Sequence, residues 1–321
     1  MALSAEHLRA LEIVERCASA LSILGILTVI VTFFSSRYFR NPIDRLILIN
    51  AFYNIFDITA TMISLSGPSA GNGSALCRFQ GFLMQMFPLA DVLWTLAMAW
   101  DVFLIVFYQY DAKALRMLER KYIAGITILT FIPAFAFIFV HTAEKGHMYG
   151  SVTLWCAIAP DWILFRIIFY YGPIWLVIVI VMVLYCLVGW KIVKGKRALK
   201  SVEGDVIPLE TRSSEKDSSE TGHVQPRPGP AASRSALSLR QYILMPVLFF
   251  VVLLAIWVAP STNRVASFVD PSYVSFPLYL AVGSTGSLRG FWNGVVFITV
   301  GMRSRQSQKR LEERRPWRQL H

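Results

Sequence analysis

The chain has 321 residues, of which 55% are hydrophobic and only 16% charged, and its formal net charge is +11. Charged residues make up about a quarter of a typical soluble domain, so this composition argues against that class. The basic residues lie in short connections between apolar runs rather than in one patch, so we expect no nucleic-acid partner.

Long runs without charge recur along the chain, and each is long enough to supply the roughly 20 residues with which a helix crosses the bilayer core. Only helices suit such runs, because backbone groups in lipid must be satisfied within the segment. We predict an all-α membrane protein, a bundle of seven transmembrane helices with an extracellular N-terminus and a cytoplasmic C-terminus. The predicted spans are residues 14–36, 45–66, 78–110, 122–141, 167–191, 241–260 and 276–300.

These spans divide the chain into five sections. Residues 1–13 are predicted to be a short extracellular tail, and residues 14–200 hold the first five helices with their loops. The first apolar run is longer than the core of a signal peptide, so we expect it to act as its own insertion signal. Residues 201–238 are rich in Ser, Glu, Lys, Pro and Gly and are predicted to be a disordered third cytoplasmic loop. Residues 239–300 hold the last two helices, and residues 301–321 form a basic tail that is expected to lie along membrane lipids.

Two features of the predicted extracellular loops support this orientation. Asn72 begins the glycosylation sequon Asn-Gly-Ser in the first extracellular loop. Cys77 begins the third helix and Cys156 lies in the second extracellular loop, where a disulfide is able to form and persist. The alternative for this pair is two unrelated free thiols. Cys17 and Cys186 fall within helices and are interpreted as packing residues.

Most Lys and Arg residues fall in the predicted cytoplasmic connections, as the positive-inside rule requires. These connections and the inner ends of the helices would face any cytoplasmic partner, although insertion topology alone also produces basic loops. Asp101, near the inner end of the third helix, is a candidate latch that pairs with Arg116 or Arg240. The candidate face for a cytoplasmic partner consists of Asp101, Lys113, Arg116, Arg120, Lys121, Lys194 and Arg240.

Several chemistries of seven-helix proteins are argued against by missing residues. The seventh span has no Lys for a retinal Schiff base, and no intramembrane cluster of His with carboxylates suggests a zinc hydrolase. The GxGD context of intramembrane aspartyl proteases is absent, and we see no self-similar halves of the kind found in transporters. We therefore expect no catalytic residues, no metal and no cofactor. Because the extracellular parts are small, any ligand should be small and bind within the helix bundle.

The residues of the third and seventh helices carry a family resemblance. Residues 77–99, CRFQGFLMQMFPLADVLWTLAMA, resemble the third helix of the cyclic-AMP-receptor-like (class E) G-protein-coupled receptors of slime moulds and fungi. Residues 288–293, LRGFWN, resemble the end of that family's seventh helix, although an uncharged residue, commonly Gln, is expected at Arg289. The DRY and NPxxY signatures of rhodopsin-like receptors are absent.

The resemblance implies a multi-pass receptor of the plasma membrane. Such a receptor senses a small extracellular ligand, cyclic-AMP-like or a nutrient, and activates a heterotrimeric G protein. The candidate face for a cytoplasmic partner is then the candidate G-protein face. The alternative is a seven-helix transporter or scaffold without G-protein coupling.

Polar residues at the level of the bilayer middle form a predicted intramembrane network. An unpaired Arg289 at that depth would cost at least about 2.5–3.5 kcal/mol, so we expect an ion pair with Asp57 or Asp91, extended by Asn54 and Asn293. The pairing either serves only to hold the bundle together or takes part in switching. The predicted network consists of Asn50, Asn54, Asp57, Asp91, Arg289 and Asn293.

A second set of polar and aromatic residues lies in the outer halves of the helices and forms a candidate ligand pocket. Arg166 and Arg264 would attract an anionic ligand such as a cyclic nucleotide. The alternative is that these side chains simply line the membrane interface, where aromatic and basic residues are common. The candidate pocket residues are Gln80, Gln85, Arg166, Tyr170, Tyr171, Trp257, Arg264 and Tyr279.

Overall fold

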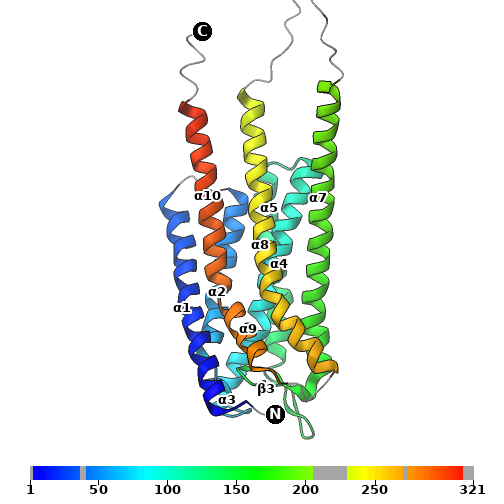
Figure 1. Ribbon diagram of the computed structural model, residues 1–321. Helices are drawn as coiled ribbons and strands as arrows, with labels where there is room; N and C mark the ends of the chain where they lie inside the picture. Colours follow the sequence, from blue (N-terminus) through cyan, green and yellow to red (C-terminus); the bar gives the residue numbers. More distant parts are fainter. Residues whose placement is uncertain (1–2, 37–40, 205–229, 270–273, 314–321) are drawn as a thin grey trace, which may run out of the picture.

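The computed structural model describes residues 3–36, 41–204, 230–269 and 274–313, and nearly all of these residues are helical (Figure 1). The predicted disordered loop lies largely outside the described residues, as does the end of the basic tail. The helices are α1 Ala5–Ser35, α2 Pro42–Ile63, α3 Ser66–Ser69, α4 Ala75–Tyr108, α5 Ala112–Ala136, α6 Ile163–Arg166, α7 Gly172–Gly204, α8 Pro230–Val269, α9 Phe276–Ser287 and α10 Arg289–Glu313. Short strands lie between α5 and α6: β1 His141–Thr142, β2 Gly146–His147, β3 Tyr149–Ser151 and β4 Cys156–Ile158.

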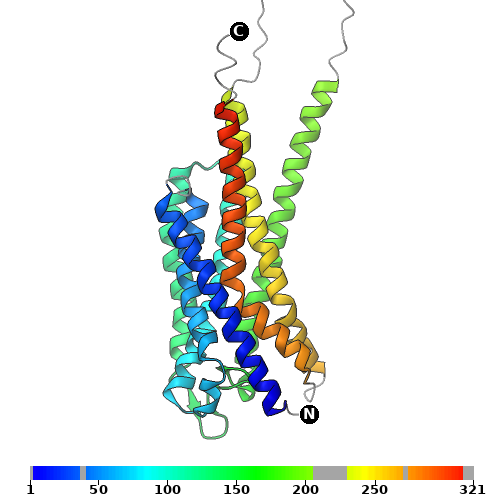
Figure 2. The same ribbon diagram turned by 60° about the vertical axis from the view of Figure 1, so that its left-hand side comes forward.

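The long helices run alongside one another as a single bundle, with the strands at one end (Figures 1 and 2). We call this the hairpin end. Helix α1 begins at the hairpin end and α10 finishes at the other. Among the described residues, five stretches are long and apolar enough to cross a membrane: Ala5–Ser35, Pro42–Ile63, Ala75–Tyr108, Pro160–Lys194 and Ile243–Ser267.

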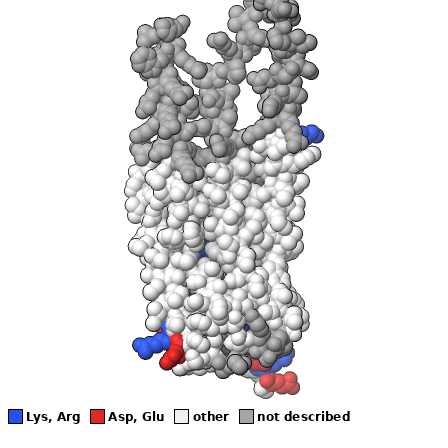
Figure 3. Space-filling model, viewed as in Figure 1, with Lys and Arg blue, Asp and Glu red and all other residues white. Residues whose placement is uncertain are grey.

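The outward-facing side chains suit a lipid environment. Leu24, Ile132 and Leu176 are each at least 60% exposed, which is unfavourable for a soluble surface but normal for helices in a bilayer. Figure 3 shows a broad band of uncharged side chains across the middle of the visible face, with acidic and basic side chains gathered at the hairpin end. The chain is therefore an α-helical membrane protein.

Helix α4 lies in the centre of the bundle. It contacts α2, α5, α7 and α8, and its Trp94 and Met98 are fully buried. Trp94 and Met98 belong to a core cluster that also includes Ile47 of α2 and Phe297 of α10. The central position of α4 explains why its polar residues are buried and find partners on several other helices.

The segment expected to be one helix over residues 276–300 is instead broken at Leu288, where α9 ends and α10 begins. The amide of Leu288 donates to the carbonyls of Ser284 and Gly286, which closes the last turn of α9 more tightly. Glycines flank the break at positions 286 and 290, and glycine is a poor helix former. The expectation of a continuous seventh helix was wrong for this local reason.

Helix α10 packs closely against α1 through glycines. A Cβ atom added at Gly25 would lie 2.4 Å from the carbonyl oxygen of Gly290, and one added at Gly294 would lie 2.7 Å from the carbonyl oxygen of Gly25. Without a hydrophobic drive between helices in lipid, small residues allow the close approach on which packing depends. These glycines therefore fix the position of α10, which begins with Arg289.

A disulfide joins the hairpin end to the bundle. Cys77 in the first turn of α4 is bonded to Cys156 of β4, with Cα atoms 5.3 Å apart. The predicted disulfide is confirmed. Burial beneath the hairpins also raises the pKa of the Tyr149 phenol, whose hydroxyl donates to the carbonyl of Ala134.

Some helix ends differ from the predicted spans. Helix α5 begins at Ala112, because the Asp111 side chain caps it by accepting from the amide of Ala114. The basic residues assigned to a loop before residue 122 therefore lie on the first turns of α5. Helices α7 and α8 continue past the predicted ends of their spans, to Gly204 and from Pro230 respectively.

Candidate functional site

A cavity of about 340 Å³ opens within the hairpin end of the bundle. This size falls within the range of small-molecule sites, about 300–1,000 Å³. Its wall is formed by α1, α2, α4, β4 with the loop before it, α6, the turn Ile167–Tyr171 before α7, α8, α9 and the first residue of α10. Most of the predicted pocket residues line it: Gln85, Arg166, Tyr170, Tyr171, Trp257, Arg264 and Tyr279.

Gln80 does not line the cavity and was wrongly included in the predicted pocket. Its buried side-chain amide donates to the carbonyls of Ala60 and Ser64, both at 3.0 Å. Its oxygen accepts from the amide of Cys156 at 2.9 Å. The end of α2 leaves carbonyls without helical partners, and Gln80 supplies the missing donor. This side chain therefore holds α2, α4 and β4 together.

Two guanidinium groups in the cavity wall retain unused donors. Arg166 is buried and donates from Nη2 to the carbonyl of Ile158. Arg264 donates to the hydroxyl of Tyr171 at 3.1 Å and lies over that ring, 4.8 Å from its centroid. The Nε atoms of both arginines are buried and have no hydrogen-bond partner among the described residues. Such donors are suited to an anionic group of a ligand.

The aromatic part of the wall is presented by a π-helical turn, Ile167–Tyr171, between α6 and α7. Pro173 follows this turn and has no N–H with which to bond the carbonyl of Phe169. Instead, Gln85 of α4 donates to that carbonyl at 2.8 Å. The turn brings Tyr170 and Tyr171 to the cavity, and π-helical turns are frequent at functional sites.

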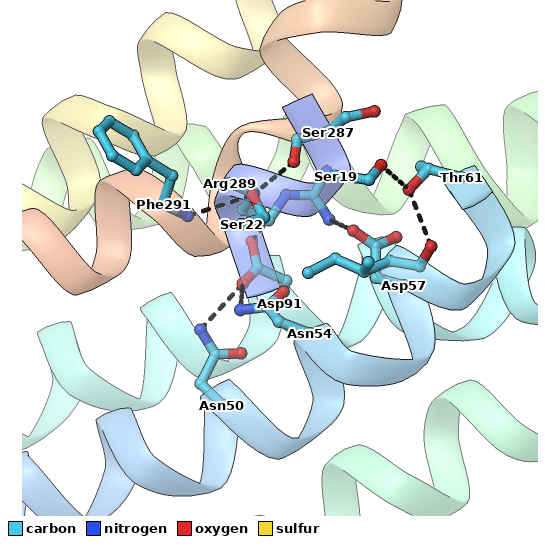
Figure 4. Close-up of polar contacts among 11 residues, drawn as sticks. Ser19, Ser22, Asn50, Asn54, Asp57, Thr61, Asp91, Ser287, Arg289 and Phe291 are labelled. Atoms are coloured by element: carbon cyan, nitrogen blue, oxygen red, sulfur yellow. Dashed lines mark hydrogen bonds and ion pairs between the residues drawn. The ribbon is translucent and has the colours of Figure 1, made fainter. Parts of the chain in front are cut away.

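Farther from the hairpin end than the aromatic wall, the cavity reaches a buried cluster of charged side chains (Figure 4). Arg289 Nη1 lies 2.9 Å from a carboxylate oxygen of Asp57, and its Nε lies 3.5 Å from one of Asp91. All three side chains are less than 10% exposed. The structure thus brings the one guanidinium between both carboxylates rather than against one of them.

Amide side chains from α2 complete the cluster. Asn50 donates to Asp91 at 2.8 Å and Asn54 donates to the same oxygen at 3.3 Å. Asn293 borders the same crevice as Asn50, Asp91 and Arg289, yet its side chain forms no hydrogen bond with another described residue. Asn50 therefore takes the place that the sequence hypothesis gave to Asn293.

Polar residues of α1 also belong to this region, although the sequence reasoning did not include them. Ser22 accepts from the amide of Phe291 at 3.1 Å and donates to the carbonyl of Ser287 at 2.5 Å, so one hydroxyl bridges the break between α9 and α10. Ser19 shares a 2.8 Å hydrogen bond with Thr61 of α2 (Figure 4). Glu15, Ser19 and Ser22 follow one another along α1 at spacings of four and three residues, which places all three side chains on one face of the helix. That spacing was the signal in the sequence.

At the other end of the bundle, the proposed latch has a different partner. Asp101 is 1% exposed and accepts a hydrogen bond from Tyr122 of α5 at 2.8 Å. Arg116 is exposed and forms no ion pair with a described residue. The side chain of Arg240 lies outside the described residues. The expected pairing of Asp101 with Arg116 was therefore wrong, because α5 turns Tyr122 and not Arg116 toward α4.

Other candidates at this end remain on the surface. Arg45 of α2 forms two hydrogen bonds of 2.8 Å with Glu119 of α5, an ion pair that the sequence reasoning missed. The remaining basic candidates are exposed: Lys113, Arg120, Lys121 and Lys194. We call these exposed residues, which lie on the first turns of α5 and on a later turn of α7, the basic surface.

At the hairpin end, the predicted glycosylation residue is exposed. The oxygen of the Asn72 side chain accepts from the amide of Ser151 at 2.9 Å, and the side chain stays at the surface. Its position near β3 is compatible with modification of the side-chain nitrogen.

Comparisons with known proteins give a consistent assignment for the greater part of the chain. A family model described as slime mold cyclic AMP receptor matches residues 4–200. Cyclic AMP receptor-like protein A of Dictyostelium discoideum is 26% identical over 199 residues, which are 62% of this chain and 50% of that protein. The chain thus spans about half the length of this relative. The family match covers α1 through most of α7, and includes Asp57 and Asp91 but not Arg264 or Arg289.

Proposed function

Because this chain belongs to the slime mold cyclic AMP receptor family, we propose that it is a plasma-membrane receptor that binds a small extracellular ligand and activates a heterotrimeric G protein. The ligand would be cyclic AMP or a molecule of similar size and charge. The observation that carries this proposal is the cavity at the hairpin end, with two guanidinium groups whose Nε donors are unused.

We propose that the bundle crosses the membrane seven times, through α1, α2, α4, α5, α7, α8 and the broken pair α9–α10. The five long apolar stretches support this proposal. The long helices also lie side by side along the length of the bundle (Figure 1). Helix α5 has a shorter apolar part because Glu119, Arg120 and Lys121 lie in its first half. The disulfide and the exposed Asn72 favour an extracellular hairpin end. The basic surface at the other end favours the cytosol.

The proposed route from ligand to G protein begins with the charged cluster. Asp57 and Arg289 line the cavity, and Arg289 is the first residue of α10. A ligand group that binds the Arg289 guanidinium therefore acts directly at the helix break. Ser22 and the glycine contact with α1 hold α10 in its present position. Activation is then a population shift between two positions of α10 relative to α2 and α4, with the ligand favouring one.

Guanine-nucleotide exchange on a purified Gα subunit tests this function. The full chain in lipid nanodiscs is expected to accelerate exchange when cyclic AMP is added, and Arg264→Leu is expected to require at least about tenfold more ligand because a charge-assisted contact is lost. Lys145→Leu, which changes a basic residue outside the cavity, is the matched control and should respond like the wild type. Absence of exchange under every ligand condition would refute G-protein coupling and favour a transporter or scaffold.

A further inference from the structure

A buried acid in the cavity wall has an unused oxygen. Glu15 of α1 is fully buried and lines the cavity. One carboxylate oxygen accepts from the hydroxyl of Ser64 at 2.5 Å, whereas Oε1 has no hydrogen-bond partner among the described residues. A buried polar atom without a partner is unfavourable for folding, and because this one belongs to a residue of the cavity wall, a group of a bound ligand is suited to complete it.

The position of Glu15 is fixed through several elements. Ser64 follows the end of α2 with a φ of 44°, a backbone conformation that serine seldom adopts. Its carbonyl is held by Gln80, which also accepts from the amide of Cys156. The acid is therefore tied through Ser64 and Gln80 to the disulfide, and its free oxygen is held in place before a ligand arrives.

The other acid in the wall is already occupied, since Asp57 is paired with Arg289 at 2.9 Å. Glu15 thus supplies the free acidic oxygen of the cavity, and the hydroxyl of Ser287 in the same wall also has no described partner. Elsewhere in the same wall, Arg166 and Arg264 supply free donors. An anion alone would satisfy the arginines but leave Glu15 without a partner. The wall therefore has two kinds of polar subsite, one for a donor and one for an acid.

We infer that the free carboxylate oxygen of Glu15 binds an amino or ammonium group of the ligand. The free guanidinium donors of Arg166 and Arg264 bind an acidic group of the same molecule. The ligand class is thus a small amphoteric molecule, an amine-bearing organic anion. This inference rests on the proposed function in that a ligand must occupy the cavity, but it does not depend on coupling to a G protein. A site that binds an N–H group in this way rejects the analogue that lacks it, because the buried acceptor is left unpaired.

Binding of matched probe pairs to the purified full chain tests the inference. One pair is cyclic AMP and purine riboside 3′,5′-cyclic monophosphate, which lacks the amino group, and the other is glutamate and glutarate. In at least one pair the amino member is expected to bind the wild type at least about tenfold more tightly. Glu15→Leu should weaken that member to the level of its partner and leave the partner unchanged. Glu15→Gln, which keeps one acceptor, should have a smaller effect, and Glu12→Gln, on the same helix but paired with Arg16 outside the cavity, should have none.

The inference is overturned if both members of each pair bind equally, if Glu15→Leu weakens both members alike, or if neither pair binds at all. Gα exchange measured on the same preparations separates this inference from the proposed function. Exchange without discrimination within a pair refutes only the role of Glu15. Discrimination without exchange refutes only the coupling to a G protein.

Discussion

Replacing Arg289 by Gln should destabilise the bundle strongly and mainly through Asp57. The substitution removes the ion pair at 2.9 Å and leaves Asp57 with no other described donor. Asp91 loses a contact at 3.5 Å but keeps the amide donors of Asn50 and Asn54. Removing one member of a buried pair costs about 3–5 kcal/mol, which changes the folding equilibrium by at least about 100-fold.

Two second-site substitutions, Asp57→Asn and Asp91→Asn, distinguish the cost of an unpaired Asp57 from a general loss of packing. In the Arg289→Gln background, Asp57→Asn should restore most of the lost stability, because it removes the carboxylate that has no remaining partner. Asp91→Asn should restore much less. Thermal unfolding of the purified variants in the same detergent, followed by intrinsic fluorescence, measures both effects. Equal rescue by the two substitutions, or a stable Arg289→Gln single variant, would refute the assignment of the cost to Asp57.

Three further predictions concern the elements around the site. Breaking the disulfide by Cys77→Ser should lower the free energy of unfolding by about 4 kcal/mol, as expected for a sequence separation of 79, and adding Cys156→Ser should cost little more. Chemical denaturation measures this, and an additive second loss would contradict it. Gly25→Leu should destabilise the α1–α10 contact by at least about 1–3 kcal/mol, because its Cβ would lie 2.4 Å from the Gly290 carbonyl; unchanged thermal stability would exclude so close a contact. Expression in eukaryotic cells should give a glycosidase-sensitive gel shift that Asn72→Gln abolishes, and its absence from the wild type would count against an extracellular hairpin end.

Features set by long runs of sequence were predicted well. The helical membrane character followed from uncharged runs, and the family assignment followed from residues 77–99, which the family match includes. The disulfide between Cys77 and Cys156 was predicted because both residues fall on one side of the predicted bilayer. These features depend on composition and local order, which the sequence displays directly.

Several features set by contacts between distant residues were not predicted. The π-helical turn before Pro173 is completed by Gln85 from another helix, and no local pattern indicates that partner. Gln80 was assigned to the pocket because it is polar and near the outer end of α4, whereas it bonds the end of α2 and Cys156. The helix break at Leu288 is bridged by the Ser22 hydroxyl of α1, a partner that the hydrophobicity of residues 276–300 does not reveal.

The roles of the pocket and G-protein residues stay predictions, because their positions alone do not establish what they bind. The cavity brings most of the predicted pocket residues together, and it adds Glu15, which the sequence reasoning did not include. An acid near a helix start is common in sequences. Its burial and its partner Ser64 become visible only when α1 and the end of α2 are seen side by side.

Filling the cavity tests the central claim, that a ligand in this cavity drives Gα exchange, most directly. Gly286 lines the cavity and an added Cβ there meets no atom within 4 Å, so Gly286→Phe occupies the ligand space without a clash at Cβ. Gly125 of α5 has equally open space and lies on the exposed outer face, so Gly125→Phe is the matched control. The account predicts that ligand-stimulated exchange is lost in Gly286→Phe and kept in Gly125→Phe. Full stimulation of Gly286→Phe, with unchanged ligand affinity, would contradict it.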